Sequence, residues 1–158
     1  SVYGLTKLEG EKIAARICPR LYIVRTQWLY GHGHNFVQTM LKLARERQHV
    51  AVVNDQTGSP TYTADLAAGI IRLVQECPYG TYHMTNNGAC TWHDFACQIF
   101  KLSGLNISVQ PVLTAEFPRP AARPSYSVLG HYMLELTVGD FFRAWEDALA
   151  DYLSNREY

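Results

Sequence analysis

Leu21-Tyr22-Ile23-Val24 is a run of four apolar residues with the length and composition of a strand buried on both faces of a parallel sheet. The residues before it, from Tyr3 to Ile17, place apolar side chains at helical spacing, and Pro19 stops that helix. A helix that leads into a buried strand is typical of an α/β fold.

Strands and helices continue to alternate through the rest of the chain. Thr91, with Asp94 three residues later, has the form of a helix capping box, and Thr61 or Thr63 is the expected cap of the preceding helix. Residues 54–60 are rich in turn formers. We expect strands at 50–53, 81–84 and 107–110, and helices at 36–47, 63–76, 91–102 and 141–153.

The composition narrows the class of protein. The 158 residues carry 14 Lys and Arg against 14 Asp and Glu, which disfavours a nucleic-acid or membrane-surface binder that relies on net charge. No apolar run approaches the roughly 20 residues of a membrane span, and no signal peptide is visible. Four scattered cysteines indicate free thiols in a reducing compartment. We therefore expect a globular, cytoplasmic protein.

Tyr3 and Lys7 form the first candidate site. Because they are four residues apart on a predicted helix, their side chains share one face, and Glu11 lies on the same face. A phenol releases its proton reluctantly at neutral pH, and an ammonium group about 4–6 Å away favours the ionised form. The pair is suited to general acid catalysis, although a surface pair without function has the same spacing.

Other polar residues have weaker claims to a function. His32 and His34 lie in a glycine-rich turn without the further Cys or acidic ligands of a metal site, so we predict no metal site. His83 is expected to be a packed or hydrogen-bonded histidine, Trp92 a packing residue, and Asp55 a residue that shapes its own turn.

Several blocks of the sequence, in order, resemble one enzyme family. Tyr3-x-x-x-Lys7 followed by Arg25-Thr26-Gln27-Trp28 is similar to the extended short-chain dehydrogenase/reductase family. Four further blocks resemble the dTDP-4-dehydrorhamnose reductases within that family: 33–37 (GHNFV), 55–61 (DQTGSPT), 80–83 (GTYH) and 122–129 (ARPSYSVL). By this resemblance the chain corresponds to the C-terminal portion of such an enzyme. One block departs from the family pattern, because Gly130 stands where the family has Asp after Leu129.

The resemblance implies a cofactor-facing group of four residues. Tyr3 would donate a proton to the C4 carbonyl of a sugar, and Lys7 would hydrogen-bond the nicotinamide ribose and acidify the tyrosine. Arg25 and Thr26 would join them in binding NADPH or NADH, because they follow a strand whose end faces the nicotinamide. The sequence does not decide between the two cofactors.

Two more residues would face the substrate. Trp28 matches the tryptophan beside the deoxysugar, and Arg123 would bind the diphosphate or form a structural ion pair. The implied reaction is the reduction of dTDP-4-dehydro-6-deoxy-L-mannose to dTDP-L-rhamnose. The implied partner is the dTDP-sugar, with no nucleic acid and no membrane, while magnesium and a homodimer stay open.

The expected fold class is α/β: an incomplete doubly wound, Rossmann-like parallel sheet that lacks its N-terminal half, with a smaller substrate-binding domain. The glycine-rich phosphate-binding turn and the family's catalytic Ser or Thr are missing, so we expect the chain alone to be inactive. Residues 1–30 and 61–85 are assigned to the sheet domain, 31–60 and 86–135 to the substrate-binding domain, and 136–158 to a C-terminal helix.

Two alternative functions stay open at this point. A non-catalytic regulatory subunit of the methionine adenosyltransferase type shares the scaffold, but its relatives lack the combined Thr26-Gln27-Trp28 and 55–61 blocks. Another nucleotide-sugar epimerase or reductase would use the same Tyr and Lys pair, usually with a different motif in place of 25–28.

Overall fold

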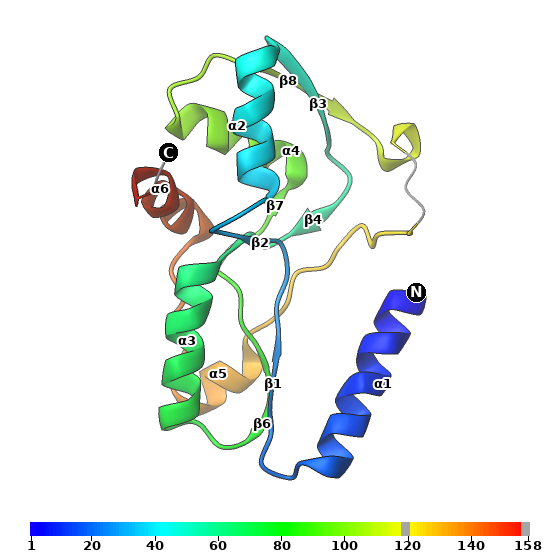
Figure 1. Cartoon of the computed structure of the whole chain (residues 1–158), viewed down its shortest axis with the longest axis vertical. Coiled ribbons are helices and arrows are strands. Elements are labelled where there is room, and N and C mark those ends of the chain that lie inside the picture. Colours follow the sequence, from blue (N-terminus) through cyan, green and yellow to red (C-terminus); the bar gives the residue numbers. More distant parts are fainter. Residues whose placement is uncertain (118–120, 156–158) are drawn as a thin grey trace.

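The computed structural model describes residues 1–117 and 121–155. Its helices and strands alternate along the chain, as expected for an α/β fold (Figure 1). The elements are α1 (Val2–Ile17), β1 (Tyr22–Arg25), β2 (Leu29–Tyr30), α2 (Phe36–Glu46), β3 (His49–Val53), β4 (Thr57–Gly58), β5 (Thr61–Tyr62), α3 (Thr63–Glu76), β6 (Gly80–His83), β7 (Cys90–Thr91), α4 (Trp92–Leu102), β8 (Ser108–Val112), the 3-10 helix η1 (Thr114–Glu116), α5 (Tyr132–Thr137) and α6 (Trp145–Asn155).

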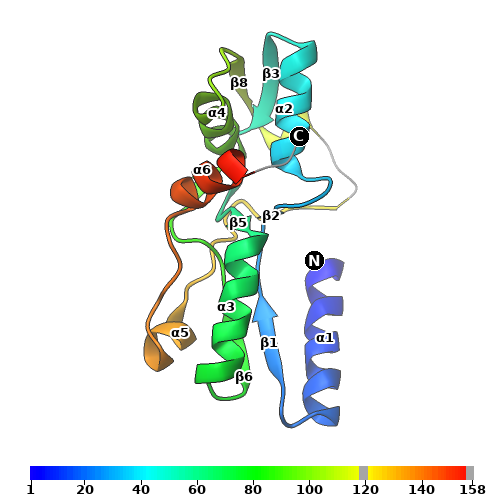
Figure 2. The ribbon, with the colours of Figure 1, turned by 60° about the vertical axis from the view of Figure 1, so that its left-hand side comes forward.

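The strand pair β1–β6 lies between helices. The two strands run parallel, with Tyr22 opposite Gly80 and Arg25 opposite His83. Helix α1 lies on one side of the pair and α3 on the other (Figures 1 and 2). Helices on both sides of parallel strands are the mark of a doubly wound α/β fold, which confirms the predicted fold class.

The other strands form three further pairs. β3 and β8 are parallel over five residues, β2 and β5 are parallel over two, and β4 and β7 are antiparallel. β4 lies inside the 54–60 segment, which was predicted to be turn alone. Within the described part of the chain the four pairs are separate two-stranded sheets.

Two apolar clusters fill the molecule. In the first, α2, α4 and α6 pack with β3 around buried side chains that include Tyr30 and Phe95. In the second, α3 and α5 pack against β1 and β6 around Tyr82 and Met84. Figure 2 shows the two halves stacked along the long axis, with β2 and β5 between them.

β1 is less buried than its sequence predicts. Residues 22–24 are half-buried and Arg25 is exposed, because within the described residues β1 pairs with β6 alone. The prediction of a strand buried on both faces is therefore wrong for this chain. Helix α1 is also uncovered: it has no buried residue, and Val2 and Ile17 are each about four-fifths exposed.

Of the two helix caps predicted from the sequence, one is confirmed and one is wrong. Thr91 and Asp94 form the predicted capping box at the start of α4. The cap of α3 is Tyr62, with no side-chain cap, so the prediction of Thr61 or Thr63 is wrong. Asn86 Oδ1 accepts a hydrogen bond from the Tyr62 amide at 2.8 Å, which satisfies that group through a tertiary contact.

Helix α6 begins at Trp145, four residues later than the predicted 141–153 helix. The Asn87 amide donates to the Arg143 carbonyl, and the Trp145 amide donates to the Asn87 carbonyl, both at 2.9 Å. These two hydrogen bonds hold the chain before Trp145 in a bridge with Asn87. Phe142, which falls within the predicted helix, lies before α6 and is buried in the second cluster.

Candidate functional site

Tyr3 and Lys7 lie in the first two turns of α1. Ser1 caps this helix, with its Oγ accepting from the Gly4 amide at 3.1 Å. Lys7 Nζ lies 5.6 Å from the centre of the Tyr3 ring, so the two side chains share one face, as their spacing predicts. Tyr3 is 67% exposed, which leaves its hydroxyl accessible to a ligand.

The start of α1 lies at the same end of the strand pair β1–β6 as the carboxyl end of β1. The helix runs antiparallel to β1 and its first turn points to the middle of the molecule, near the junction of the two halves (Figure 1). In open α/β sheets, ligands bind outside the carboxyl ends of the strands. Tyr3 and Lys7 therefore stand where a ligand of this fold is expected.

The residues that follow β1 carry polar atoms with unused hydrogen-bonding capacity. Thr26 Oγ1 and Gln27 Nε2 are buried, and within the described part of the chain neither has a hydrogen-bond partner. Gln27 Oε1 accepts from the Ser127 hydroxyl at 2.7 Å, which fixes the amide plane. Buried polar groups are normally paired, so these two unpaired atoms distinguish the segment that follows β1.

Trp28 is held in a strained conformation. Its φ of 46° is unusual for a bulky side chain, and such outliers gather at functional sites. The ring stacks on Trp92, with ring centres 3.6 Å apart and planes 14° apart. Gly58 leaves space for it, because a Cβ atom at that position would lie 2.5 Å from Trp28 Cε2.

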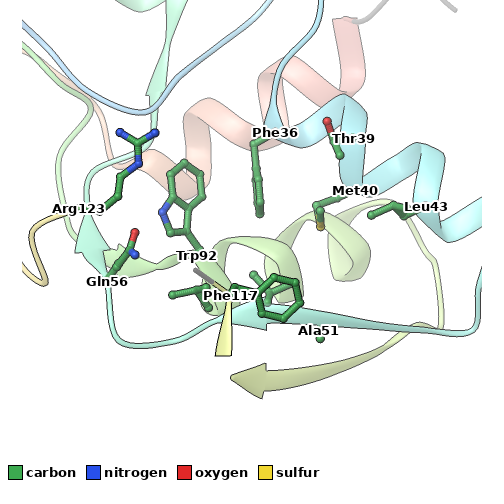
Figure 3. Close-up of a pocket in the computed structure, with 11 residues that line it drawn as sticks. Phe36, Thr39, Met40, Leu43, Ala51, Gln56, Trp92, Phe117 and Arg123 are labelled. Atoms are coloured by element: carbon green, nitrogen blue, oxygen red, sulfur yellow. The ribbon is translucent and has the colours of Figure 1, made fainter. Parts of the chain in front are cut away.

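A cavity of about 470 Å³ lies beside this stack, between α2, β3, α4 and the segment that carries Arg123. Figure 3 shows Arg123 and Gln56 at one end and Met40 and Leu43 at the other. Its lining combines planar rings, aliphatic side chains and a guanidinium: Phe36, Thr39, Met40, Leu43, Ala51, Val52, Val53, Gln56, Trp92, Phe117 and Arg123.

This lining matches the chemistry of an aromatic base joined to a phosphate. Phe36 and Trp92 are in contact, with ring centres 4.6 Å apart, and offer apolar faces to a planar ring. The guanidinium of Arg123 suits bidentate recognition of phosphate oxygens. Cavities of this size commonly bind small molecules.

Arg25 is engaged by another residue of the chain. Its Nε and one terminal nitrogen donate to the two carboxylate oxygens of Glu11, at 2.8 and 2.5 Å. The Arg25 hydrogen bonds hold the pKa of Glu11 below its usual range. The role of Arg25 in cofactor binding stays a prediction.

Two absences concern the described residues, 1–117 and 121–155. No group of three His, Cys, Asp or Glu side chains there is placed to hold a metal ion. No helix there is long and apolar enough to cross a membrane.

A family model described as the RmlD substrate binding domain matches residues 1–157. The chain belongs to this family. The RmlD substrate-binding domain thus spans almost all of its length, from the Tyr3 and Lys7 pair to the last helix.

Solved structures carry the same fold as this RmlD domain. A dTDP-4-dehydrorhamnose reductase from Clostridium acetobutylicum has a TM-score of 0.95 and 52% identity over 98% of this chain and 55% of its own. The reductase from Bacillus anthracis, solved in complex with NADP, has a TM-score of 0.92 and 43% identity over 99% of this chain and 56% of its own.

A curated relative is the spore coat polysaccharide biosynthesis protein SpsK of Bacillus subtilis, 45% identical over 99% of this chain and 55% of its own length. The chain therefore spans about half the length of the relatives it matches.

Three residues of this RmlD domain stand out in the structure but not in the sequence prediction. Trp92, predicted to be a packing residue, packs against the first cluster and also lines the cavity and stacks on Trp28. Its position directly after the Thr91 cap is the signal that places it in the first turn of α4. Gln56 lines the cavity. Glu11 shares a face with Tyr3 and Lys7, but its pairing with Arg25 was not predictable from spacing.

Proposed function

We propose that this chain forms the proton-donating and substrate-binding part of an NAD(P)H-dependent dTDP-4-dehydrorhamnose reductase. The Tyr3 and Lys7 pair carries the proposal, because it places a phenol beside an ammonium group at the carboxyl end of β1, open to a ligand. The relatives named as reductases of this class, one of them bound to NADP, support the same reading.

The chemistry assigned to this chain is a proton transfer. The Tyr3 hydroxyl donates its proton to the C4 carbonyl oxygen of the sugar as that oxygen gains negative charge. The Lys7 ammonium stabilises the phenolate that remains and can hydrogen-bond a ribose hydroxyl. When bound, NADPH or NADH supplies the hydride. We assign Thr26, which follows β1 directly, to the nicotinamide side of the site.

The nucleotide end of the substrate fits the cavity. We place the thymine ring against Phe36 and Trp92 and the diphosphate at Arg123. Trp28 stacks on Trp92, which lines the cavity. The stack thereby extends the aromatic surface from the cavity to the residues that follow β1. The sugar would then lie between Trp28 and Tyr3.

The reductase activity requires a dinucleotide-binding half beside this chain. The chain holds no glycine-rich phosphate turn and spans about 55% of its relatives. The assay therefore uses the assembled reductase, meaning this chain joined to a dinucleotide-binding half such as that of the Bacillus anthracis relative.

The assembled reductase is assayed for NADPH oxidation with dTDP-4-dehydrorhamnose and with UDP- and GDP-linked 4-keto sugars. We expect turnover with the dTDP-sugar and a kcat/KM at least about 10-fold lower with the other two, because a site built for one base and sugar rejects mismatched partners. Arg123→Gln should raise the KM for the dTDP-sugar. Equal kcat/KM for all three nucleotides would contradict the proposed substrate.

The same assay separates the alternatives. Another nucleotide-sugar reductase would prefer a different 4-keto sugar, whereas a non-catalytic subunit would turn over none of them. Turnover that depends on Tyr3 favours a reductase over the subunit.

A further inference from the structure

Helix α1 carries the proposed proton donor but has almost no packing of its own. Of its 16 residues, just Glu11 and Ala14 are partly covered, and all the others are exposed. Within the described residues, apolar burial contributes little to holding the helix, so its polar contacts with β1 carry more weight.

Glu11 makes the most specific of these contacts. Its two carboxylate oxygens receive hydrogen bonds from two nitrogens of Arg25, the last residue of β1. This side-by-side geometry fixes both distance and orientation, unlike a single-point ion pair. The Glu11 side chain is 21% exposed and the Arg25 side chain 42%, so the pair is shielded from solvent mainly on the Glu11 side.

Arg25 also contacts the neighbouring strand. Its Nη1 lies 3.4 Å from His83 Nε2, and His83 Nδ1 lies 3.0 Å from the carbonyl of Gly130. A guanidinium can only donate and a carbonyl can only accept. His83 therefore accepts at Nε2 and donates at Nδ1, which is the neutral tautomer.

The contacts form one chain of hydrogen bonds across three elements and the loop before residue 132. It runs from Glu11 on α1 through Arg25 on β1 and His83 on β6 to Gly130, seven residues after Arg123. Tyr3 lies eight positions before Glu11, and the rise of an α-helix makes this about 12 Å along the helix axis. Anchoring α1 at Glu11 thus sets how far Tyr3 extends beyond the end of β1.

We propose that Glu11, Arg25 and His83 are positioning residues that fix the Tyr3 and Lys7 helix relative to β1 and to the segment carrying Arg123. Glu11 and His83 need touch neither substrate nor cofactor, and the positioning role of Arg25 does not depend on its predicted contact with the cofactor. The inference rests on the proposed function for its effect on turnover, but the anchoring of α1 can be measured without any catalysis.

The first test is hydrogen exchange of the α1 amides in the 158-residue chain. Glu11→Gln keeps the size of the side chain and removes its charge, so exchange in α1 should rise roughly 2- to 5-fold, with α2 and α4 unchanged. Glu9→Gln is the matched control, because Glu9 pairs with Lys12 at 2.7 Å on the same helix without reaching β1. Equal exchange in the two variants, or no rise in Glu11→Gln, overturns the proposal.

The second test is turnover in the assembled reductase. Glu11→Gln should lower kcat at least about 10-fold with little change in KM for the dTDP-sugar, because a small displacement of a catalytic group is costly while the nucleotide cavity is intact. Glu9→Gln should match the parent, and Glu11→Asp, which keeps the charge, should recover part of kcat. A parent-like kcat in Glu11→Gln overturns the positioning role.

The proposed function and the anchoring of α1 can be disproved independently of each other. If Tyr3→Phe leaves turnover intact, the proposed function fails, and the exchange experiment still decides whether Glu11 anchors α1. If Tyr3→Phe abolishes turnover but Glu11→Gln leaves α1 exchange unchanged, only the anchoring fails.

Discussion

Gly58 shows how closely single residues are fitted around Trp28. A Cβ atom there would lie 2.5 and 2.7 Å from two atoms of the indole ring and 2.9 Å from Gln27 Oε1. Since Trp28 is also pinned by its stack on Trp92, the ring cannot move away without losing that contact.

Gly58→Ala should therefore lower the free energy of unfolding by about 1–3 kcal/mol and weaken the near-ultraviolet circular dichroism of the stacked tryptophans. Urea titration and circular dichroism measure the two effects. Gly10→Ala is the control: it lies in α1 with no atom within 4 Å of the added Cβ, and should stabilise the chain by about 0.5–1 kcal/mol. A Gly58→Ala protein with the parent's stability and spectrum would show that the ring is not confined.

Residue pairs close in sequence could be predicted, and those brought together by tertiary structure could not. The contact of Tyr3 with Lys7 follows from four-residue helical spacing. The pairing of Glu11 with Arg25 joins a helix to the end of a strand, and no periodicity encodes it. The stack of Trp28 on Trp92 depends on the positive φ of Trp28, which no residue-type preference indicates.

At the scale of elements, Asp55 ties the loop after β3 to η1. Its carboxylate accepts from the Thr114 hydroxyl at 2.6 Å and from the Thr114 amide at 3.0 Å. The Thr114 hydroxyl also accepts from Gln56 Nε2 at 2.9 Å, so this contact fixes one end of the cavity. Asp55 was expected to shape its own turn and instead holds a distant one.

These hydrogen bonds lower the pKa of Asp55, with the Thr114 hydroxyl as the main cause. A depressed folded-state pKa contributes stability that is present above the unfolded value, near 3.9, and is lost as pH falls through the folded value. Asp55→Asn should therefore lower the urea midpoint at pH 7. Between pH 5 and pH 2 the variant should lose less stability than the parent. Asp147→Asn, at an exposed position on α6, is the control. Parallel pH profiles for parent and Asp55→Asn would contradict this role.

Most helices and longer strands could be predicted because their signals are local. The capping box of Thr91 and Asp94 lies within four residues and was predicted correctly. The start of α6 was placed too early because Asn87 holds residues 143–145 from far along the chain. Strands of two residues, such as β4, have no periodicity to detect.

At the scale of the whole molecule, the proposed site draws on elements that belong to both apolar clusters. One cluster supports the cavity through α2, β3 and α4, and the other supports β1 and β6. The half-exposed β1 and the uncovered α1 were not predictable from composition, because apolar runs indicate burial without showing what covers them. The division into a sheet domain (1–30 and 61–85), a substrate-binding domain (31–60 and 86–135) and a C-terminal helix (136–158) stays a prediction.

The central claim is that the Tyr3 hydroxyl supplies the proton in carbonyl reduction, and single-turnover oxidation of NADPH by the assembled reductase tests it most directly. Tyr3→Phe removes the hydroxyl from a side chain that is 67% exposed, so folding should be unaffected. Tyr132→Phe, equally exposed on α5, is the matched control. We predict a rate roughly 10²- to 10⁴-fold lower in Tyr3→Phe and unchanged in Tyr132→Phe. A Tyr3→Phe enzyme that oxidises NADPH at the parent rate would contradict the account.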